Sequence, residues 1–334
     1  MSINHSGGRR RATLRTGLVA RTAPIAAILI LVLVLAGATA PGAESFAPDR
    51  SPVFKTTPQG ELRMHLFLPP DHTVTSRRAA VVFFFGGGWR KGRPEQFYPQ
   101  CAYLASRGMV AASAEYRVQE RHGALPPDCV RDGKSAIRWM RVHASELGVD
   151  PRRVAAGGGS AGGHVAASAA LLRGFDEEGE AEDPAPARPD ALLLFNPVLD
   201  TGPGSASHER VQEYWKEFSP LHNIRPGAAP TIVFLGADDH VLPVATAERF
   251  RDRMKSAGSR CDLRLYAGQR HGFFNYDGGG NAFYYATLIA CDRFLGSLGY
   301  VEGEPTLRPP GVGSGTAGVR RRGSSRSGPP HRTR

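Results

Sequence analysis

The run VAAGGGSAGGH at residues 154–164 constrains the fold of this chain more than any other feature. It places Ser160 two residues after one glycine, Gly158, and two residues before another, Gly162. The pattern G-x-S-x-G is short, and a chain with 40 glycines can contain it by chance. The segments on either side must therefore decide whether Ser160 lies in a reaction centre or in an ordinary glycine-rich turn.

Segments with the pattern of strands alternate with segments with the pattern of helices on both sides of this run. Apolar stretches predict strands at residues 61–69, 79–85, 109–116, 153–157, 191–198, 231–236 and 261–268. Stretches with helical spacing follow at residues 128–147, 162–172, 244–257 and 282–298. The alternation predicts an α/β fold in which a mostly parallel central sheet carries helices on both faces.

The serine run joins the predicted strand 153–157 to the predicted helix 162–172. A serine at such a junction turns the chain sharply, and side chains two residues before and after it would collide. Glycines at positions 158 and 162 remove that collision. We therefore predict that Ser160 is a catalytic nucleophile at the carboxyl edge of the sheet, where α/β folds bind their ligands.

A serine hydroxyl becomes a good nucleophile only when a base takes its proton, so a histidine and an orienting acid are expected later in the chain. The segment GADDHVLP after strand 231–236 supplies Asp239 as the acid, with Asp238 as the alternative. The segment GQRHGFF after the next strand supplies His271 as the base.

Other histidines near these segments fit the order of strand and loop less well. His164 is four residues from Ser160 on one helix and is expected to pack beside the site. His240 adjoins the acid and is expected to face solvent or to support it. His208 and His222 belong to an insertion at residues 199–230, which can border a substrate site but is too small for a lid domain.

The segment FFFGGGWRKG at residues 83–92 ends a buried strand with three glycines. Glycines let backbone N–H groups approach a developing negative charge, so the amides of Gly86, Gly87 and Ala161 are predicted to form an oxyanion hole. Trp89 follows the glycines and is expected either to narrow the acyl side of the substrate site or to pack under the loop.

Together these segments resemble the α/β-hydrolase-fold serine esterases of the acetyl esterase and acetylxylan-esterase-like group, related to the hormone-sensitive lipases and the BD-FAE carbohydrate esterases. The resemblance covers roughly residues 60–300 and also includes AEYR and DGKSAIRWMRVHASELGVDPRRV. It implies an α/β-hydrolase catalytic domain at residues 41–301 without a large cap. Phe85 stands where such families usually have histidine, which leaves the backbone donors intact. Gly159 replaces the acid common in the lipase-like branch, which argues against that branch.

The expected function is hydrolysis of short acyl esters, with acetyl favoured, of a carbohydrate or another polyol. The expected partner is a small-molecule or polysaccharide ester, and no cofactor, metal ion or nucleic acid is expected. Two alternatives stay open: a serine peptidase of the prolyl-oligopeptidase-like type, and an envelope-tethered binding protein with an inert hydrolase fold. The oligomeric state is not predicted.

Both ends of the chain are basic, whereas its middle is nearly neutral. Residues 1–40 carry five arginines and residues 305–334 carry seven, with no acid in either, so the net charge of +11 leaves −1 for residues 41–304. No basic stripe for nucleic acid results. The N-terminal arginines precede an apolar run and small residues, which predicts an export signal at residues 1–40 and a secreted or periplasmic protein, or else an uncleaved membrane anchor at residues 24–40.

Three further segments are expected to carry no catalytic chemistry. Residues 302–334, rich in Gly, Pro, Ser and Arg, are predicted to form a disordered tail. The acidic stretch at residues 176–190 lacks the spacing of a calcium loop and is predicted to be a solvated loop. The cysteines can form one or two disulfides in an exported protein, in a pairing that the sequence does not determine, and their spacing predicts no zinc site: Cys101, Cys129, Cys261 and Cys291.

Overall fold

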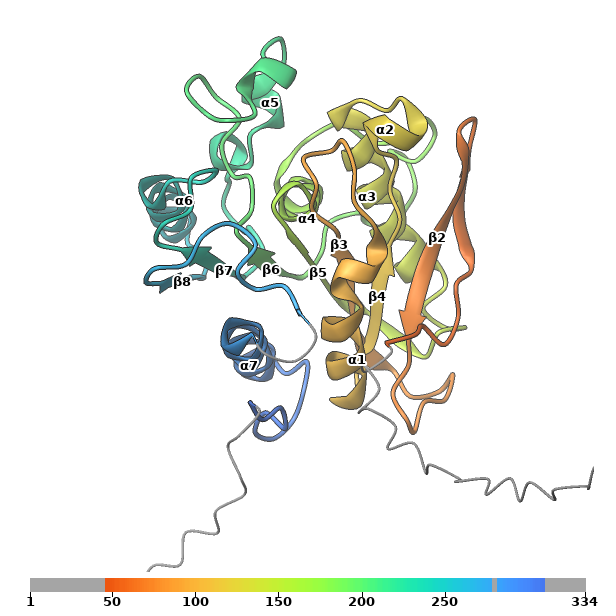
Figure 1. The fold of residues 1–334 in the computed structure, drawn as a ribbon. Coiled ribbons are helices and arrows are strands. Elements are labelled where there is room, and N and C mark those ends of the chain that lie inside the picture. The colour runs from red at the N-terminus through yellow and green to blue at the C-terminus, as the bar shows by residue number, and fades with distance from the viewer. Residues whose placement is uncertain (1–45, 278–280, 310–334) are drawn as a thin grey trace, which may run out of the picture. The chain divides into compact units, whose positions relative to one another are not determined.

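An eight-stranded sheet forms the centre of the protein in a computed structural model, which describes residues 46–277 and 281–309 (Figure 1). The strand order is β1-β2-β4-β3-β5-β6-β7-β8. The pairs β1–β2 and β2–β4 are antiparallel, and the other neighbours are parallel. The predicted α/β class with a mostly parallel sheet is confirmed.

The elements follow the predicted alternation. The strands are β1 (Val53–Thr57), β2 (Gly60–Phe67), β3 (Arg78–Phe84), β4 (Val110–Ala114), β5 (Val149–Gly159), β6 (Ala191–Phe195), β7 (Thr231–Gly236) and β8 (Cys261–Tyr266). The longer helices are α1 (Tyr98–Ser106), α3 (Pro126–Val142), α4 (Ala161–Leu171), α6 (Val244–Ser256) and α7 (Ala282–Ser297). Short helical turns are η1 (Pro94–Phe97), α2 (Gln119–His122), η2 (His208–Arg210), α5 (Trp215–Phe218) and η3 (Pro220–Asn223).

Two hydrophobic cores lie on opposite faces of the sheet. Side chains of a strand point alternately to its two faces, and β3 is buried on both. Val81 and Phe83 pack in one core with residues of α1 and α7. Val82 and Phe84 pack in the other with residues of α3, α4 and α6. The parallel pairing of β3 to β8 places the carboxyl ends of these strands at one edge of the sheet.

Several boundaries differ from the sequence prediction. Strand β1 and helix α1 were not predicted, and α3 ends at Val142 rather than near residue 147. The helix stops early because residues 143–148 turn through Gly148, at φ 58°, and Val149 then pairs with Arg78 at the start of the longer β5. Residues 302–309 were predicted to belong to a disordered tail, but the start of this segment is bound to the folded domain. The Arg107 guanidinium donates to the carbonyls of residues 302 and 303.

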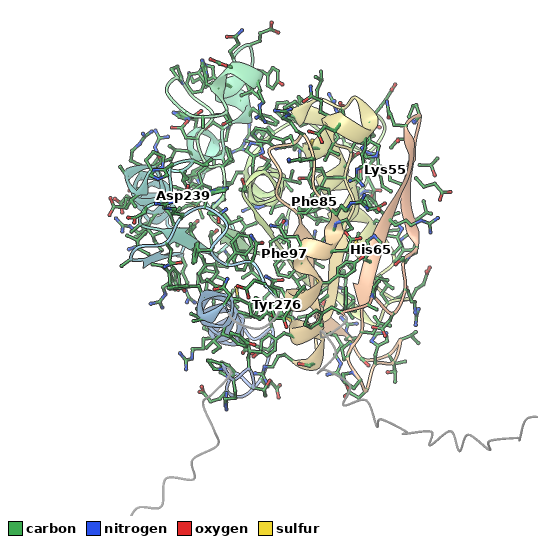
Figure 2. All side chains as sticks on the ribbon, viewed as in Figure 1. Lys55, His65, Phe85, Phe97, Asp239 and Tyr276 are labelled. Atoms are coloured by element: carbon green, nitrogen blue, oxygen red, sulfur yellow. The ribbon has the colours of Figure 1, made fainter. Side chains whose placement is uncertain are left out.

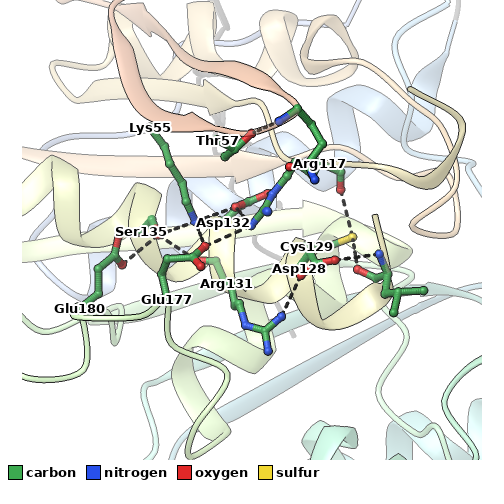
Figure 3. A network of polar contacts seen from close by, with 12 residues as sticks. Lys55, Thr57, Arg117, Asp128, Cys129, Arg131, Asp132, Ser135, Glu177 and Glu180 are labelled. Carbon is green, nitrogen blue, oxygen red and sulfur yellow. Dashed lines mark hydrogen bonds and ion pairs between the residues drawn. The ribbon is translucent and has the colours of Figure 1, made fainter. Parts of the chain in front are cut away.

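The acidic loop is folded onto α3 and β1 rather than solvated throughout, which corrects the sequence prediction (Figure 3). The Asp132 side chain is 0% exposed and lies 2.7 Å from both Lys55 Nζ and Arg117 Nη2. Glu177 from the acidic loop contacts the same two cations. Glu180 accepts a hydrogen bond from Ser135 Oγ at 2.8 Å. The loop therefore supplies carboxylates to a partly buried ionic network.

All four cysteines are free and buried, so none of them forms a disulfide. Cys129 and Cys261 lie in the core beneath α3, α4 and α6, and Cys101 and Cys291 lie in the core beneath α1 and α7. Burial raises the pKa of each thiol, to about 12 for Cys261.

The helices of residues 46–277 and 281–309 are all too short or too polar to cross a membrane. The predicted export signal or anchor at residues 1–40 lies outside the described residues, as do residues 310–334 of the predicted tail.

Candidate active site

Ser160 occupies a strained turn between β5 and α4. Its φ of 53° and ψ of −118° lie outside the regions that residues with a side chain usually adopt. A Cβ on Gly162 would lie 2.0 Å from the Phe84 carbonyl oxygen, and a Cβ on Gly158 would lie 2.5 Å from the Gly162 carbonyl carbon. Only glycine fits at both positions, which is the local reason for the sharp turn.

His271 follows β8 and lies between Ser160 and Asp239. Its Nε2 is 2.9 Å from Ser160 Oγ, and its Nδ1 is 2.8 Å from Asp239 Oδ2. A carboxylate can only accept hydrogen bonds, so Nδ1 of His271 carries the proton and Nε2 is left to accept from the serine hydroxyl. The three residues therefore form one continuous hydrogen-bonded relay.

Asp239 lies in the loop between β7 and α6 and is labelled in Figure 2. Its side chain is 0% exposed, and its Oδ1 accepts from the backbone amides of Val241 and Leu242 at 2.8 and 3.1 Å. Burial raises the pKa of Asp239, but the hydrogen bonds from His271 and these amides outweigh burial and hold the pKa below its usual range. The neighbouring Asp238 is exposed.

Asn196 is a polar residue at the site that the sequence did not indicate. It follows β6 with φ 33°, and its Nδ2 lies 3.4 Å from His271 Nε2. Its Oδ1 accepts from the Gly272 amide at 2.9 Å. The signal that could have found it is an Asn-Pro pair directly after a buried strand, at the same edge of the sheet as Ser160.

The glycine loop after β3 is held in position from behind. Tyr116 stacks on Phe85 with ring centroids 4.1 Å apart and donates from its hydroxyl to the Phe85 carbonyl at 2.6 Å. Arg210, from the insertion, donates to the Gly88 carbonyl. Phe85, which Figure 2 labels, thus anchors the loop by stacking, at the position where the families that this chain resembles usually have histidine.

The amide of Gly86 is already occupied, which corrects its predicted place in the oxyanion hole. It donates to Gln96 Oε1 at 2.6 Å, and an N–H bound this closely must lose that partner before it can bind an oxyanion. Gly87, at φ 124°, lines the same cavity as Ser160. Ala161 is the first residue of α4, so its N–H has no acceptor within the helix.

Trp89 does not contact the cavity, which corrects the expectation that it narrows the acyl side. It is 2% exposed and packs edge-on against the His164 ring, with centroids 5.0 Å apart. Its φ of 58° turns the chain so that the indole enters the core. The alternative expectation, that Trp89 packs under the loop, describes this placement.

The competing histidines lie apart from the relay. His164 is fully buried, and its Nε2 lies 2.9 Å from the Phe218 carbonyl. Burial lowers the pKa of His164 to about 4, against the opposing effect of that hydrogen bond, so the ring is neutral at ordinary pH. His240 is exposed. His208 and His222 interact with Thr201 and Ser219 of the insertion and do not line the cavity at Ser160.

The cavity at Ser160 has a volume of about 590 Å³, within the usual range for small-molecule sites. Ser160 and His271 line it, and Phe274 is its one large apolar lining residue. No group of three or more potential metal ligands occurs in the parts of the chain that the structure describes.

Comparison with protein families matches residues 64–194 to BD-FAE and residues 211–296 to the dienelactone hydrolase family. A probable carboxylic ester hydrolase of Mycobacterium tuberculosis, LipM, is 29% identical over 69% of this chain and 56% of its own length. An acetylxylan esterase of Xylanibacter ruminicola is 26% identical over 64% of this chain and 44% of its own length. The chain thus spans about half the length of the curated relatives it matches.

The structure is similar to those of esterase 2 from Thermogutta terrifontis. The form phosphoramylated by tabun has 43% sequence identity and a TM-score of 0.74, over 78% of this chain and 98% of that one. The propionate-bound form has 43% identity and a TM-score of 0.72, over 76% and 96%. At this identity and coverage the likeness concerns sequence as well as fold.

Proposed function

Because the chain belongs to the α/β-hydrolase family of esterases, we propose that it is a serine esterase that removes short acyl groups, chiefly acetyl, from carbohydrate or other polyol esters. The relay from Ser160 through His271 to Asp239 is the observation that carries the proposal. Its two hydrogen bonds have the lengths expected in an acyl-transfer triad, and its residues occur along the chain in the order serine, aspartate, histidine.

In the proposed reaction, Ser160 Oγ attacks the ester carbonyl while His271 Nε2 takes the hydroxyl proton. The negative charge moves to the carbonyl oxygen, where the amides of Gly87 and Ala161 stabilise it. The tetrahedral intermediate collapses, the C–O bond to the alcohol breaks, and His271 returns the proton to the departing alkoxide. Water then attacks the acyl-serine while His271 takes a proton from the water. The bond between the acyl carbon and Ser160 Oγ breaks, His271 returns the proton to Oγ, and the carboxylic acid leaves.

Asp239 keeps its charge throughout this cycle. Its carboxylate holds the histidine ring in orientation and stabilises the imidazolium that forms in each transition state. The depressed pKa of Asp239 supports this role, because the group stays ionised across the pH range in which an esterase works.

A short acyl group is proposed because the cavity offers little apolar surface for a long one. Its lining contains glycines, polar side chains and Phe274, and each methylene left unburied loses ~0.8 kcal/mol of binding. The similar solved structures hold propionate and butyrate, and one relative is named an acetylxylan esterase.

Turnover of p-nitrophenyl acetate, butyrate and octanoate, alongside acetylated xylan, tests the proposal. We expect kcat/KM to fall from acetate or butyrate to octanoate by ~10-fold or more, equal to ~1.4 kcal/mol of transition-state binding. Faster turnover of octanoate would overturn the short-acyl assignment, and absence of turnover on every ester would overturn the esterase.

Export is proposed from the order of basic, apolar and small residues in the first forty positions. N-terminal sequencing of protein purified from the natural cells should find a start between Thr39 and Ala43. An intact Met1 on membrane-bound material would instead identify residues 24–40 as an anchor.

A further inference from the structure

The cavity at Ser160 is cationic. Its lining includes Lys91 and Arg93, and no carboxylate is among the residues that line it. Its remaining polar side chains are those of Ser160 and His271 and of three carboxamides, Gln96, Asn196 and Asn275. The residues that line this cavity therefore carry two positive charges and no negative one.

Lys91 and Arg93 are exposed, and neither forms an ion pair with any residue at positions 46–277 or 281–309. Two neighbouring arginines do have partners within the protein. Arg90 Nη2 lies 3.9 Å from Glu120, and Arg121 donates to the Gly92 carbonyl. The charges of Lys91 and Arg93 are thus left for a ligand.

Two carboxylates that adjoin residues of this cavity, Asp239 through a hydrogen bond and Glu95 in sequence, lie outside its lining. Asp239 is buried and bound to His271. Glu95 lines a different cavity, which shares only Gln96 and Asn275 with the first. The positive charges of Lys91 and Arg93 are therefore not compensated by a carboxylate in the lining of this cavity.

The backbone that carries both cations is fixed relative to Ser160. The amides of Arg90 and Lys91 donate to the Gly87 carbonyl at 3.1 and 3.2 Å. A Cβ on Gly92 would lie 2.2 Å from the Gly86 carbonyl oxygen, so the chain between Lys91 and Arg93 packs directly on the glycine loop. The two side chains extend from a rigid support rather than from a free loop.

We propose that Lys91 and Arg93 select esters that carry a carboxylate near the scissile bond, a specificity that rests on the proposed esterase function. Two positive charges beside the site attract such a substrate, and salt weakens that attraction because the groups are exposed. The acidic group can belong to the alcohol, as on an acidic sugar, or to the acyl chain.

Matched pairs of esters distinguish these two sources. 4-Acetoxybenzoate against its methyl ester places the charge on the alcohol side, and mono-p-nitrophenyl glutarate against its methyl ester places it on the acyl side. For each pair, the ratio of kcat/KM for the charged ester to that for the neutral one is compared between the native protein and K91Q/R93Q. Intrinsic reactivity differences within a pair cancel in this comparison.

We expect the ratio to fall at least ~5-fold in K91Q/R93Q for one pair or both, and to fall in the native protein when salt is raised. The control R173Q/R188Q removes two exposed cations from a cavity that contains no relay residue, and its ratio should match the native one. An unchanged ratio in both pairs, with neutral esters still hydrolysed, would overturn the charge selection alone.

Binding supplies a readout that does not depend on turnover. The dissociation constants of 4-acetoxybenzoate and its methyl ester for Ser160→Ala, measured by NMR titration with and without K91Q/R93Q, should show the same loss of preference for the charged ester. No preference in this titration would overturn the selection even if the protein hydrolysed neither ester, an outcome that would separately overturn the esterase.

Discussion

Gln96 donates a hydrogen bond from its side-chain amide to Asn275 Oδ1 over 2.8 Å, and so connects the two loops that border the candidate active site. At its other end, Gln96 Oε1 accepts from the Gly86 amide in the glycine loop. Asn275 in turn donates to the Gly272 carbonyl, one residue after His271. One carboxamide therefore couples the position of the glycine loop to that of the histidine.

Replacing Gln96 by alanine should loosen this coupling without unfolding the protein. We expect Gln96→Ala to lower kcat for p-nitrophenyl acetate by ~10-fold with little change in KM, because misplacement of the catalytic groups affects the transition state most. Asn275→Ala should have a similar effect, and the double variant should be less impaired than the product of the two. Fully additive effects would contradict the coupling.

Loss of the Ser160 hydroxyl should abolish ester hydrolysis. Ser160→Ala is expected to lower kcat at least ~10³-fold, because the nucleophile acts as one unit with its base. A fluorophosphonate probe should add one covalent label to the native protein, at Ser160, and none to the variant, as peptide mass spectrometry can determine. Near-native turnover by the variant would exclude the serine mechanism.

The two adjacent acids should differ sharply on replacement. Asp239→Asn is expected to lower kcat ~10³-fold or more, since an amide at this position favours the wrong histidine tautomer. Asp238→Asn is the matched control and should be nearly silent because that side chain is exposed. The reverse order of the two kcat values would move the acid to Asp238.

Glu177 should stabilise the fold at neutral pH and lose that effect in acid. Burial raises the pKa of Glu177, but Lys55 and Arg117 outweigh burial and hold the pKa below its ordinary value of 4.5. A carboxylate with a lowered folded-state pKa stabilises the protein above its unfolded-state pKa, and this stabilisation is lost as the pH falls through the folded-state pKa. Glu177→Gln should therefore cost about 1 kcal/mol at about pH 7 and progressively less below about pH 4.

Urea denaturation across this pH range measures the effect of Glu177→Gln on the free energy of unfolding. The adjacent Glu178 is exposed, which makes Glu178→Gln the control that should change stability little at any pH. A cost for Glu177→Gln that grows on acidification would refute the sign of the effect.

Local pattern was enough to predict most of the sheet, because the central strands are buried on both faces and read as continuous apolar runs. It was not enough for α1, in which seven of nine residues are buried, so no polar face marks a helical period. It also missed β1, an edge strand of half-buried residues without an apolar run.

The site residues that could be predicted from the sequence are those that come directly after a strand, in the order along the chain that this fold requires. Ser160, Asp239 and His271 each follow a strand whose carboxyl end lies at one edge, and the structure brings them within hydrogen-bonding distance. The bond from Gly86 to Gln96 depends instead on how a loop folds back over ten residues, and the burial of Trp89 depends on a positive φ. Neither leaves a pattern in the sequence.

The four buried thiols divide evenly between the two faces of the sheet. The rate at which each pair reacts with a thiol reagent therefore reports how often that face opens. Cys101 and Cys291 can meet a thiol reagent only when the layer of α1 and α7 moves, and Cys129 and Cys261 only when the opposite layer moves. Burial also keeps them protonated, so labelling in the closed state is slow on both counts. Equal labelling rates for both pairs would mean that the protein opens as a whole. Unequal rates would show which helical layer opens more often by local unfolding.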